Sequence, residues 1–186
     1  MKKVLVILFD NTEEIEALAP ADILRRAGAD VLTAAAGNSR RIVGRSGIPI
    51  EADSLLADVA AERFDAAVLP GGPGVFAAVS DARLAGLLKR LDGEGALMCA
   101  ICAAPAALGR AGIIGGRRCA SHPSVAGELP SRDAAASTVR DGKLITSQGA
   151  GTAVEFALEI ASALFGGEKA AEVAGSICFK FPSGQC

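Results

Sequence analysis

The sequence contains no tryptophan and no tyrosine, and its 186 residues include only seven phenylalanines and one histidine. Aromatic side chains supply most base-stacking surfaces and many interface anchors, so a nucleic-acid-binding role finds little support. The charge balance gives no support for nucleic-acid binding either, because 19 basic and 21 acidic residues leave a formal net charge of −2. We therefore expect no nucleic acid among the partners of this chain.

Long apolar runs are missing as well. The longest, residues 96–108, contains Pro105 and is shorter than the roughly 18 residues that a membrane span needs. Residues 4–9 follow two lysines, as in a signal peptide, but this run stops at Asp10, and a signal peptide needs about 7–15 apolar residues before a cleavage site. These features predict a cytoplasmic protein with no membrane partner.

Cysteine is sparse and odd in number, which favours reduced thiols over a disulfide framework. One histidine and scattered cysteines give no tetrahedral ligand set, so we expect no metal. Gly149-Ala150-Gly151-Thr152 looks like the start of a dinucleotide-binding loop, but the full motif needs glycine where Val154 stands, and no Walker loop is present. We expect no cofactor. Whether any thiol is reactive stays open at this point.

The composition is that of a globular protein, with 51% hydrophobic and 22% charged residues. A chain of this length usually forms one domain and buries roughly 70% of its unfolded surface. We predict a single domain over residues 1–186, with residues 181–186 as a loose tail.

Segments with strand character alternate with helical ones. Apolar runs predict strands at 3–9, 30–36, 64–69 and 96–101, a short strand at 117–121, and an extended segment or hairpin at 42–50. Asp141-Gly142 predicts a hairpin between 137–140 and 143–147. Helices are predicted from residues 10–12 to Gly28, with Pro20 kinking or splitting this one, and at 81–91, 103–109, 153–165 and 168–174. The alternation predicts an α/β fold whose mostly parallel sheet is covered by helices on both faces.

Ligands of such sheets bind beyond the carboxyl ends of the strands, and Cys102 directly follows the strand predicted at 96–101. Small neighbours and Pro105 allow a tight turn into a helix, and a thiol at a helix N-terminus is favoured in its thiolate form. The pattern predicts a nucleophile presented as serine is in hydrolases, although G-x-S-x-G is absent. The alternative is a small buried apolar residue, the usual place of a free cysteine.

Cys99 and Cys102 have the C-x-x-C spacing of redox pairs. Cys99 lies inside the predicted strand, however, and three strand steps separate the two Cα atoms by about 10 Å. A disulfide needs roughly 7 Å or less, so the spacing disfavours a dithiol pair.

The run Glu13, Glu14 and Glu16 follows the end of the first predicted strand. Carboxylates at a helix start are usually solvated and suit the positive end of the helix dipole. Glu16 differs from the other two because it lies one turn into the helix, where it can face the Cys102 side of the sheet edge.

Two further strand ends carry candidate residues. Gly71-Gly72 forms either a plain turn or a place where backbone N–H groups approach a ligand as an oxyanion cradle. His122 is either a surface histidine or, with a reactive thiol elsewhere in the chain, a member of the same site.

Six motifs together resemble the ThiJ/PfpI superfamily, in the branch that includes the Parkinson's-disease-associated protein, bacterial YajL and the cofactor-free glyoxalase III and protein deglycase enzymes. The resemblance extends from Lys3 to about Lys180. The motifs are EEIE (13–16), RRAG (25–28), LPGG (69–72), AICAAP (100–105), SHP (121–123) and TSQGAGTAVEFAL (146–158).

The resemblance implies a flavodoxin-like three-layer sandwich, similar to class I glutamine amidotransferases, and a homodimer. It implies that Cys102 is a nucleophile on an elbow, that Glu16 contacts the thiol and that His122 lies nearby. It also implies that the N–H groups of Gly72 and Ala103 bind an oxyanion.

The chain departs from the family pattern at three positions. The family often has arginine where this chain has Ser46 and Gln148. Its protease-like and amidotransferase-like branches have histidine directly after the nucleophile, where this chain has Ala103.

The resemblance further implies a cysteine enzyme that acts on small dicarbonyls, converting methylglyoxal to lactate, or on glycated adducts. Because like charges repel, we expect Glu16 to hold a proton while Cys102 is ionised. The alternative is an oxidative-stress sensor or chaperone that acts through oxidation of Cys102. A thiol amidase or peptidase ranks third because of Ala103.

Overall fold

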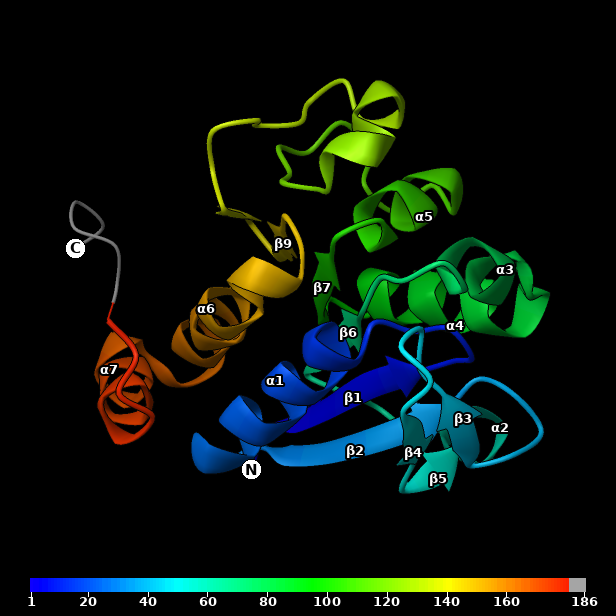
Figure 1. Ribbon diagram of the computed structural model, residues 1–186, viewed down its shortest axis with the longest axis horizontal. Helices are drawn as coiled ribbons and strands as arrows, with labels where there is room; N and C mark the ends of the chain where they lie inside the picture. Colours follow the sequence, from blue (N-terminus) through cyan, green and yellow to red (C-terminus); the bar gives the residue numbers. More distant parts are fainter. Residues whose placement is uncertain (181–186) are drawn as a thin grey trace.

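The structure, a computed structural model, describes residues 1–180, and the predicted tail at 181–186 lies outside the described residues. Seven strands form one sheet in the order β5-β2-β1-β6-β7-β9-β8 (Figure 1). They are β1 (Lys3–Leu8), β2 (Asp30–Ala35), β5 (Ser54–Leu55), β6 (Ala66–Leu69), β7 (Leu97–Ile101), β8 (Thr138–Asp141) and β9 (Leu144–Ser147). Neighbouring strands run parallel except β8 and β9, which form the predicted antiparallel hairpin.

Helices cover both faces of this sheet, as the alternation predicted (Figure 1). One face packs against α1 (Glu14–Arg26) and α6 (Ala153–Phe165), and α7 (Gly167–Ser176) packs on α6. The other packs against α2 (Leu56–Val59), α3 (Val75–Ser80), α4 (Ala82–Gly93) and α5 (Ala104–Arg110). The result is the expected flavodoxin-like three-layer sandwich.

The continuous apolar runs form strands because helices cover the sheet on both sides. In β1, Val4, Val6 and Leu8 belong to the core on the α1 side, whereas Leu5 and Ile7 belong to the core on the α4 side. All five side chains are fully buried. A sheet with one solvated face would instead expose every second residue of this strand.

A separate hairpin lies over the start of α1. It consists of β3 (Arg41–Val43) and β4 (Pro49–Glu51), which pair antiparallel, so the hairpin expected within residues 42–50 is present. The N–H of Asn11 donates to the carbonyl of Val43, and the N–H of Arg45 donates to the carbonyl of Thr12. These bonds hold the hairpin against the loop that follows β1.

Three local expectations differ from the structure. Pro20 does not split its helix, because α1 continues through it and the flanking Ala17 and Leu24 keep packing on the sheet. Residues 117–121 form no strand beyond one isolated bridge from Cys119, since β9 already has β7 and β8 as neighbours. The strand β5, the helices α2 and α3 and the two 3₁₀ turns at Pro123–Glu128 and Ala150–Thr152 were not predicted.

Within residues 1–180, no helix combines the length and the apolar character that a membrane span requires.

Candidate active site

Cys102 occupies the sharp turn between β7 and α5 that the sequence predicts. Its φ is 66°, a left-handed conformation that costs a non-glycine residue roughly 1–2 kcal/mol. The Cys102 N–H donates to the carbonyl of Ser147 at 3.0 Å, and the Cys102 carbonyl accepts from the N–H of His122 at 2.8 Å. Bonds to two different segments therefore fix the turn, and the half-buried thiol projects beyond the end of β7.

Glu16 lies against this thiol, as expected. Glu16 is 1% exposed, and its carboxyl and the Cys102 thiol shift each other's pKa. Its Oε2 accepts a 2.8 Å hydrogen bond from the N–H of Gly71. A Cβ on Gly71 would lie 2.7 Å from the Cβ of Cys102 and 2.8 Å from Glu16 Oε2. Only glycine at position 71 allows the carboxyl and the thiol to approach so closely.

Burial dominates the protonation of this pair. It raises the pKa of Glu16 to about 7, although hydrogen bonds from Gly71 and Cys102 partly oppose the rise. Burial, the charge of Glu16 and the hydrogen bond to Glu16 raise the pKa of the Cys102 thiol to about 12. The raised pKa of Glu16 agrees with the expectation. A protonated Glu16 beside an ionised Cys102 stays a prediction, because the two groups share one titration.

Two backbone N–H groups approach the sulfur. Those of Ala103 and Gly72 lower the pKa of Cys102 and so favour negative charge there. Gly72 has φ 102°, and a Cβ at this position would lie 2.4 Å from the carbonyl oxygen of Asn11. Both strain and contact require glycine here. The N–H of Gly71, by contrast, is used by Glu16.

His122 reaches the edge of the same site. Its Nδ1 accepts from the N–H of Ser124 at 3.2 Å and lies 2.8 Å from the Ser124 hydroxyl. This arrangement leaves Nε2 to carry the ring proton in the neutral form. A Cβ on Gly149 would lie 3.8 Å from His122 Cδ2 and 3.8 Å from Glu16 Oε1, so these three residues are neighbours.

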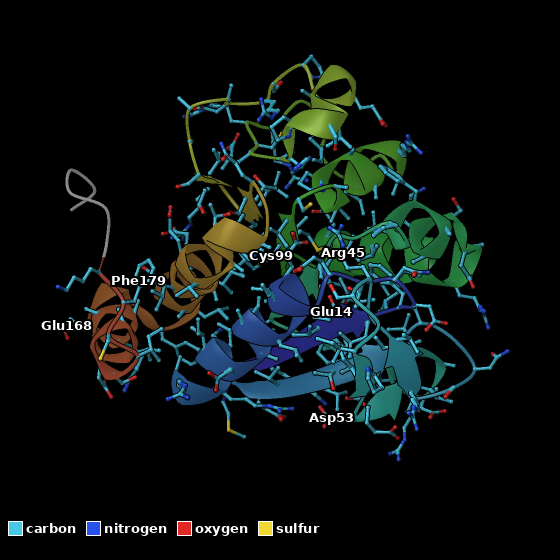
Figure 2. All side chains as sticks on the ribbon, viewed as in Figure 1. Glu14, Arg45, Asp53, Cys99, Glu168 and Phe179 are labelled. Atoms are coloured by element: carbon cyan, nitrogen blue, oxygen red, sulfur yellow. The ribbon has the colours of Figure 1, made fainter. Side chains whose placement is uncertain are left out.

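Glu13 and Glu14 are not solvated, contrary to the simplest interpretation of the acidic run. Their exposed fractions are 8% and 5%. Glu13 caps α1 by accepting from the N–H of Glu16 at 2.8 Å. Glu14 Oε1 accepts from the N–H of Ser46 at 2.8 Å and ties the hairpin to α1 (Figure 2). The two carboxyls therefore hold the surroundings of Glu16 in place.

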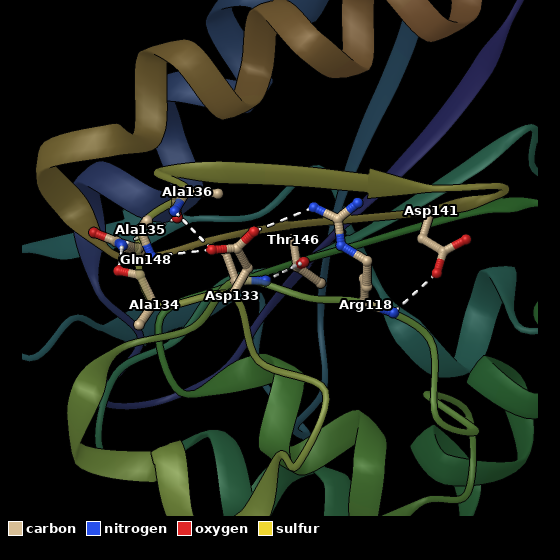
Figure 3. Close-up of polar contacts among 9 residues, drawn as sticks. Arg118, Asp133, Ala134, Ala135, Ala136, Asp141, Thr146 and Gln148 are labelled. Atoms are coloured by element: carbon tan, nitrogen blue, oxygen red, sulfur yellow. Dashed lines mark hydrogen bonds and ion pairs between the residues drawn. The ribbon is translucent and has the colours of Figure 1, made fainter.

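Ser46 and Gln148, where the family often has arginine, form hydrogen bonds that hold neighbouring segments in place. Ser46 bonds to Glu14, while the neighbouring Arg45, labelled beside the start of α1 in Figure 2, supplies a positive charge that lowers the pKa of Glu16. Gln148 turns its amide towards the carbonyls of Ala134 and Ala136, at 3.3 and 3.0 Å (Figure 3).

The loop that Gln148 holds is also fixed from its other side. Asp133 accepts from the N–H groups of Ala135 and Ala136 and pairs with Arg118, whose own N–H donates to Asp141 (Figure 3). This loop is joined to the segment that carries His122, because the N–H of Asp133 donates to the carbonyl of Cys119.

The remaining described cysteines differ from Cys102. Cys99, Cys119 and Cys178 are free thiols, so Cys99 and Cys102 form no disulfide. Cys99 lies inside β7 and is buried, and burial raises its pKa far above the ordinary value. Among residues 1–180, no three His, Cys, Asp or Glu side chains gather as a metal site would require.

Gly149 is the member of this cluster to which the sequence assigned no role. Gly149 stands directly after Gln148, which follows β9, so the rule that pointed to Cys102 and Gly71 also applied to it.

Comparisons with known proteins show which family this chain is similar to. The sequence model of the DJ-1/PfpI family matches residues 2–163. Protein dj-1beta of Drosophila melanogaster is 42% identical over 177 residues, which cover 93% of this chain and 95% of that protein. A Caenorhabditis elegans protein named glutathione-independent glyoxalase DJR-1.2 is 34% identical over 172 residues, covering 91% of each chain.

Solved structures show the same likeness. A structure described as Toxoplasma gondii DJ-1, oxidized, superposes with a TM-score of 0.94 at 32% identity and covers 97% of this chain and all of its own.

Proposed function

Because the chain belongs to the DJ-1/PfpI family, we propose that it is a cofactor-independent cysteine enzyme acting on reactive dicarbonyls. The reaction is the conversion of methylglyoxal to lactate or the removal of such groups from glycated adducts. The observation that carries this proposal is the buried Glu16 carboxyl beside the Cys102 thiol, with the N–H groups of Ala103 and Gly72 favouring negative charge on the sulfur. The relative from Caenorhabditis elegans named as a glyoxalase supports the choice of substrate.

In the first step, the Cys102 sulfur attacks the aldehyde carbon. The S–C bond forms, the π electron pair of the carbonyl moves to oxygen, and the thiol proton passes to Glu16. Glu16 acts as general base because its buried carboxyl lies beside the thiol and has a pKa of about 7. The N–H groups of Ala103 and Gly72 stabilise the new oxyanion, which then takes the proton from Glu16.

In the second step, Glu16 moves a proton between the two former carbonyl carbons. It takes the proton from the carbon bonded to sulfur, and the electron pair passes through an enediol to the neighbouring carbon, which receives this proton. The hydroxyl proton on the first carbon moves to the oxygen of the second carbon, by way of the enediol. One carbon is oxidised to a thioester while the other is reduced to an alcohol, so no external oxidant is needed. Water then hydrolyses the thioester to lactate and restores the Cys102 thiol.

Production of lactate from methylglyoxal tests this function. We expect Cys102→Ser to lower the rate to the background level and Glu16→Gln to lower it about a hundredfold or more. Cys178→Ser is the matched control, because it removes an exposed thiol just beyond the end of α7. Retention of wild-type lactate production by Cys102→Ser would refute the proposal.

A second candidate function is sensing of oxidative stress, with or without chaperone activity. Its support is that the N–H groups of Ala103 and Gly72 and a protonated Glu16 can hydrogen-bond to the oxygens of a Cys102 sulfinate. Mild peroxide treatment followed by intact mass separates the two functions. Sensing predicts two added oxygens on Cys102 and a changed partner or holdase activity, whereas catalysis predicts turnover that oxidation abolishes. Amidase or peptidase activity stays third, because Ala103 stands where those branches have histidine.

We also propose that the chain forms a homodimer. Ile15 and Leu18 on α1 and Val43 and Ile48 on the hairpin are large apolar side chains that are 43–55% exposed. The Glu14–Ser46 hydrogen bond holds these two elements together, so one partner surface can cover both. Light scattering of the purified protein should give twice the chain mass, and Leu18→Glu should shift it towards the monomer. A wild-type monomer at micromolar concentration would contradict the dimer.

A further inference from the structure

Gly149 lines the side of the site where Glu16 has its second oxygen. Glu16 Oε2 is held by Gly71, and Oε1 faces Gly149. At the place of a Cβ on Gly149, the described atoms within 4 Å, apart from those of the two neighbouring residues, are Glu16 Oε1 and His122 Cδ2, both at 3.8 Å. Residue 149 therefore places no side chain beside the working carboxyl.

Nothing in the backbone demands glycine at this position. The φ and ψ of Gly149 are 164° and −170°, which is extended conformation that any residue adopts. The 3.8 Å distances from such a Cβ to Glu16 Oε1 and His122 Cδ2 are ordinary van der Waals contacts. An alanine fits without displacing its neighbours, so the absence of a side chain here serves something other than folding.

The position of Gly149 is also fixed. The Thr152 hydroxyl donates to the carbonyl of Gly149 at 2.9 Å, and the Gly149 N–H donates back to Thr152 Oγ1 at 3.2 Å. Thr152 Oγ1 lies 2.6 Å from the hydroxyl of the buried Ser147, whose carbonyl holds the N–H of Cys102. A side chain added at 149 is therefore held in the site and does not swing away from it.

We propose that Gly149 sets the upper size of the group carried by the ketone carbon of the substrate. This inference rests on the proposed function, in which Glu16 delivers a proton to that carbon. The carbon must then lie next to the Glu16 carboxyl, and its substituent must occupy the neighbouring space. Gly149 keeps that space open, so the chain accepts α-oxoaldehydes with bulky substituents, such as phenylglyoxal, as well as glyoxal and methylglyoxal.

The test compares wild type, Gly149→Ala and the control Gly151→Ala. Gly151 is in the same turn, is exposed and has no atom within 4 Å of a Cβ. We expect Gly149→Ala to keep its thermal midpoint and its kcat/KM for glyoxal within about twofold. Its kcat/KM for phenylglyoxal should fall about tenfold or more, since one methyl group in a pocket discriminates by that order. Gly151→Ala should match wild type on all three substrates.

An equal change for glyoxal and phenylglyoxal, or no change for either, overturns the inference. Failure of the proposed function gives a different result, because wild type then produces no hydroxy acid from any dicarbonyl. The rates of Cys102 alkylation by iodoacetamide and by the bulkier N-ethylmaleimide assess Gly149 in that case. A selective loss of the bulkier reaction in Gly149→Ala supports a size limit, and equal rates in both proteins refute it.

Discussion

Burial of the Glu16 carboxyl predicts a pH dependence of stability that can be measured without any substrate. The pKa of this group rises from 4.5 to about 7 on folding, chiefly because the carboxyl is buried. Between these values the folded protein holds a proton that the unfolded chain releases. The free energy of unfolding therefore contains a contribution from Glu16 that is fully present below pH 4.5 and is lost as the pH rises to 7.

The size of this contribution follows from the two pKa values. A rise from 4.5 to about 7, at about 1.4 kcal/mol for each pKa unit, corresponds to about 3 kcal/mol. Glu16→Gln has nearly the same shape and keeps an acceptor for the N–H of Gly71, but it does not titrate. Between pH 4 and pH 8, wild type should lose about 3 kcal/mol relative to this variant.

Urea unfolding of both proteins at several pH values gives the required difference. Comparing the change with pH removes any constant cost of the substitution. Glu168→Gln is the control, since it removes a carboxyl at the outer edge of α7, far from the site (Figure 2). If wild type and Glu16→Gln lose stability in parallel, the carboxyl titrates as it does in water and the argument from burial fails.

Three further predictions concern the same region. The kcat/KM for methylglyoxal should rise with pH to a plateau with an apparent pKa of about 7, because the general base is the charged form of Glu16. Arg45→Gln should move that apparent pKa upward in the pH–rate profile, because the charge of Arg45 lowers the pKa of Glu16. Gly72→Ala should lower the free energy of unfolding by about 2 kcal/mol or more in urea, because its φ is 102° and its Cβ would meet a backbone oxygen at 2.4 Å. Thr146→Val should cost about 1–3 kcal/mol in the same measurement, because the Ala120 N–H loses its 2.8 Å acceptor inside the core.

Each of these predictions has a result that contradicts it. A pH–rate profile that is unchanged by Arg45→Gln excludes the electrostatic link to Glu16, and Arg41→Gln on the same hairpin controls for the lost charge. Wild-type stability of Gly72→Ala means that the turn relaxes. Wild-type stability of Thr146→Val means that the Ala120 N–H finds another acceptor.

The main features of the fold follow from local patterns. Continuous apolar runs predict strands buried on both faces, and the alternation with helices predicts the parallel sheet. The turn at Cys102 is also readable, because small residues and Pro105 follow a buried strand. Pro20 shows the limit of local rules, since packing of α1 on the sheet outweighs the preference of proline for a helix end.

The surroundings of the thiol depend on contacts between distant segments, which no local pattern reports. Glu14 is buried only because a hairpin more than thirty residues later donates the Ser46 N–H to it. The pKa of the Cys102 thiol also depends on a distant segment. Its position at a helix start suggested a thiolate, but burial and the neighbouring Glu16 raise its pKa. The resemblance to the family supplied the pairing of Glu16 with Cys102, which spacing alone left undetermined.

Mapping of the covalent intermediate tests the central claim most directly. Wild-type protein is mixed with methylglyoxal, quenched in acid during turnover and digested, because acid preserves a lactoyl thioester and releases reversible hemithioacetals. The account predicts the added mass of one methylglyoxal on the peptide that contains Cys102, and no such peptide from Cys102→Ser or Glu16→Gln. Lactate formation by wild type with no modified Cys102 peptide at any quench time, or an equal adduct in Glu16→Gln, would contradict it.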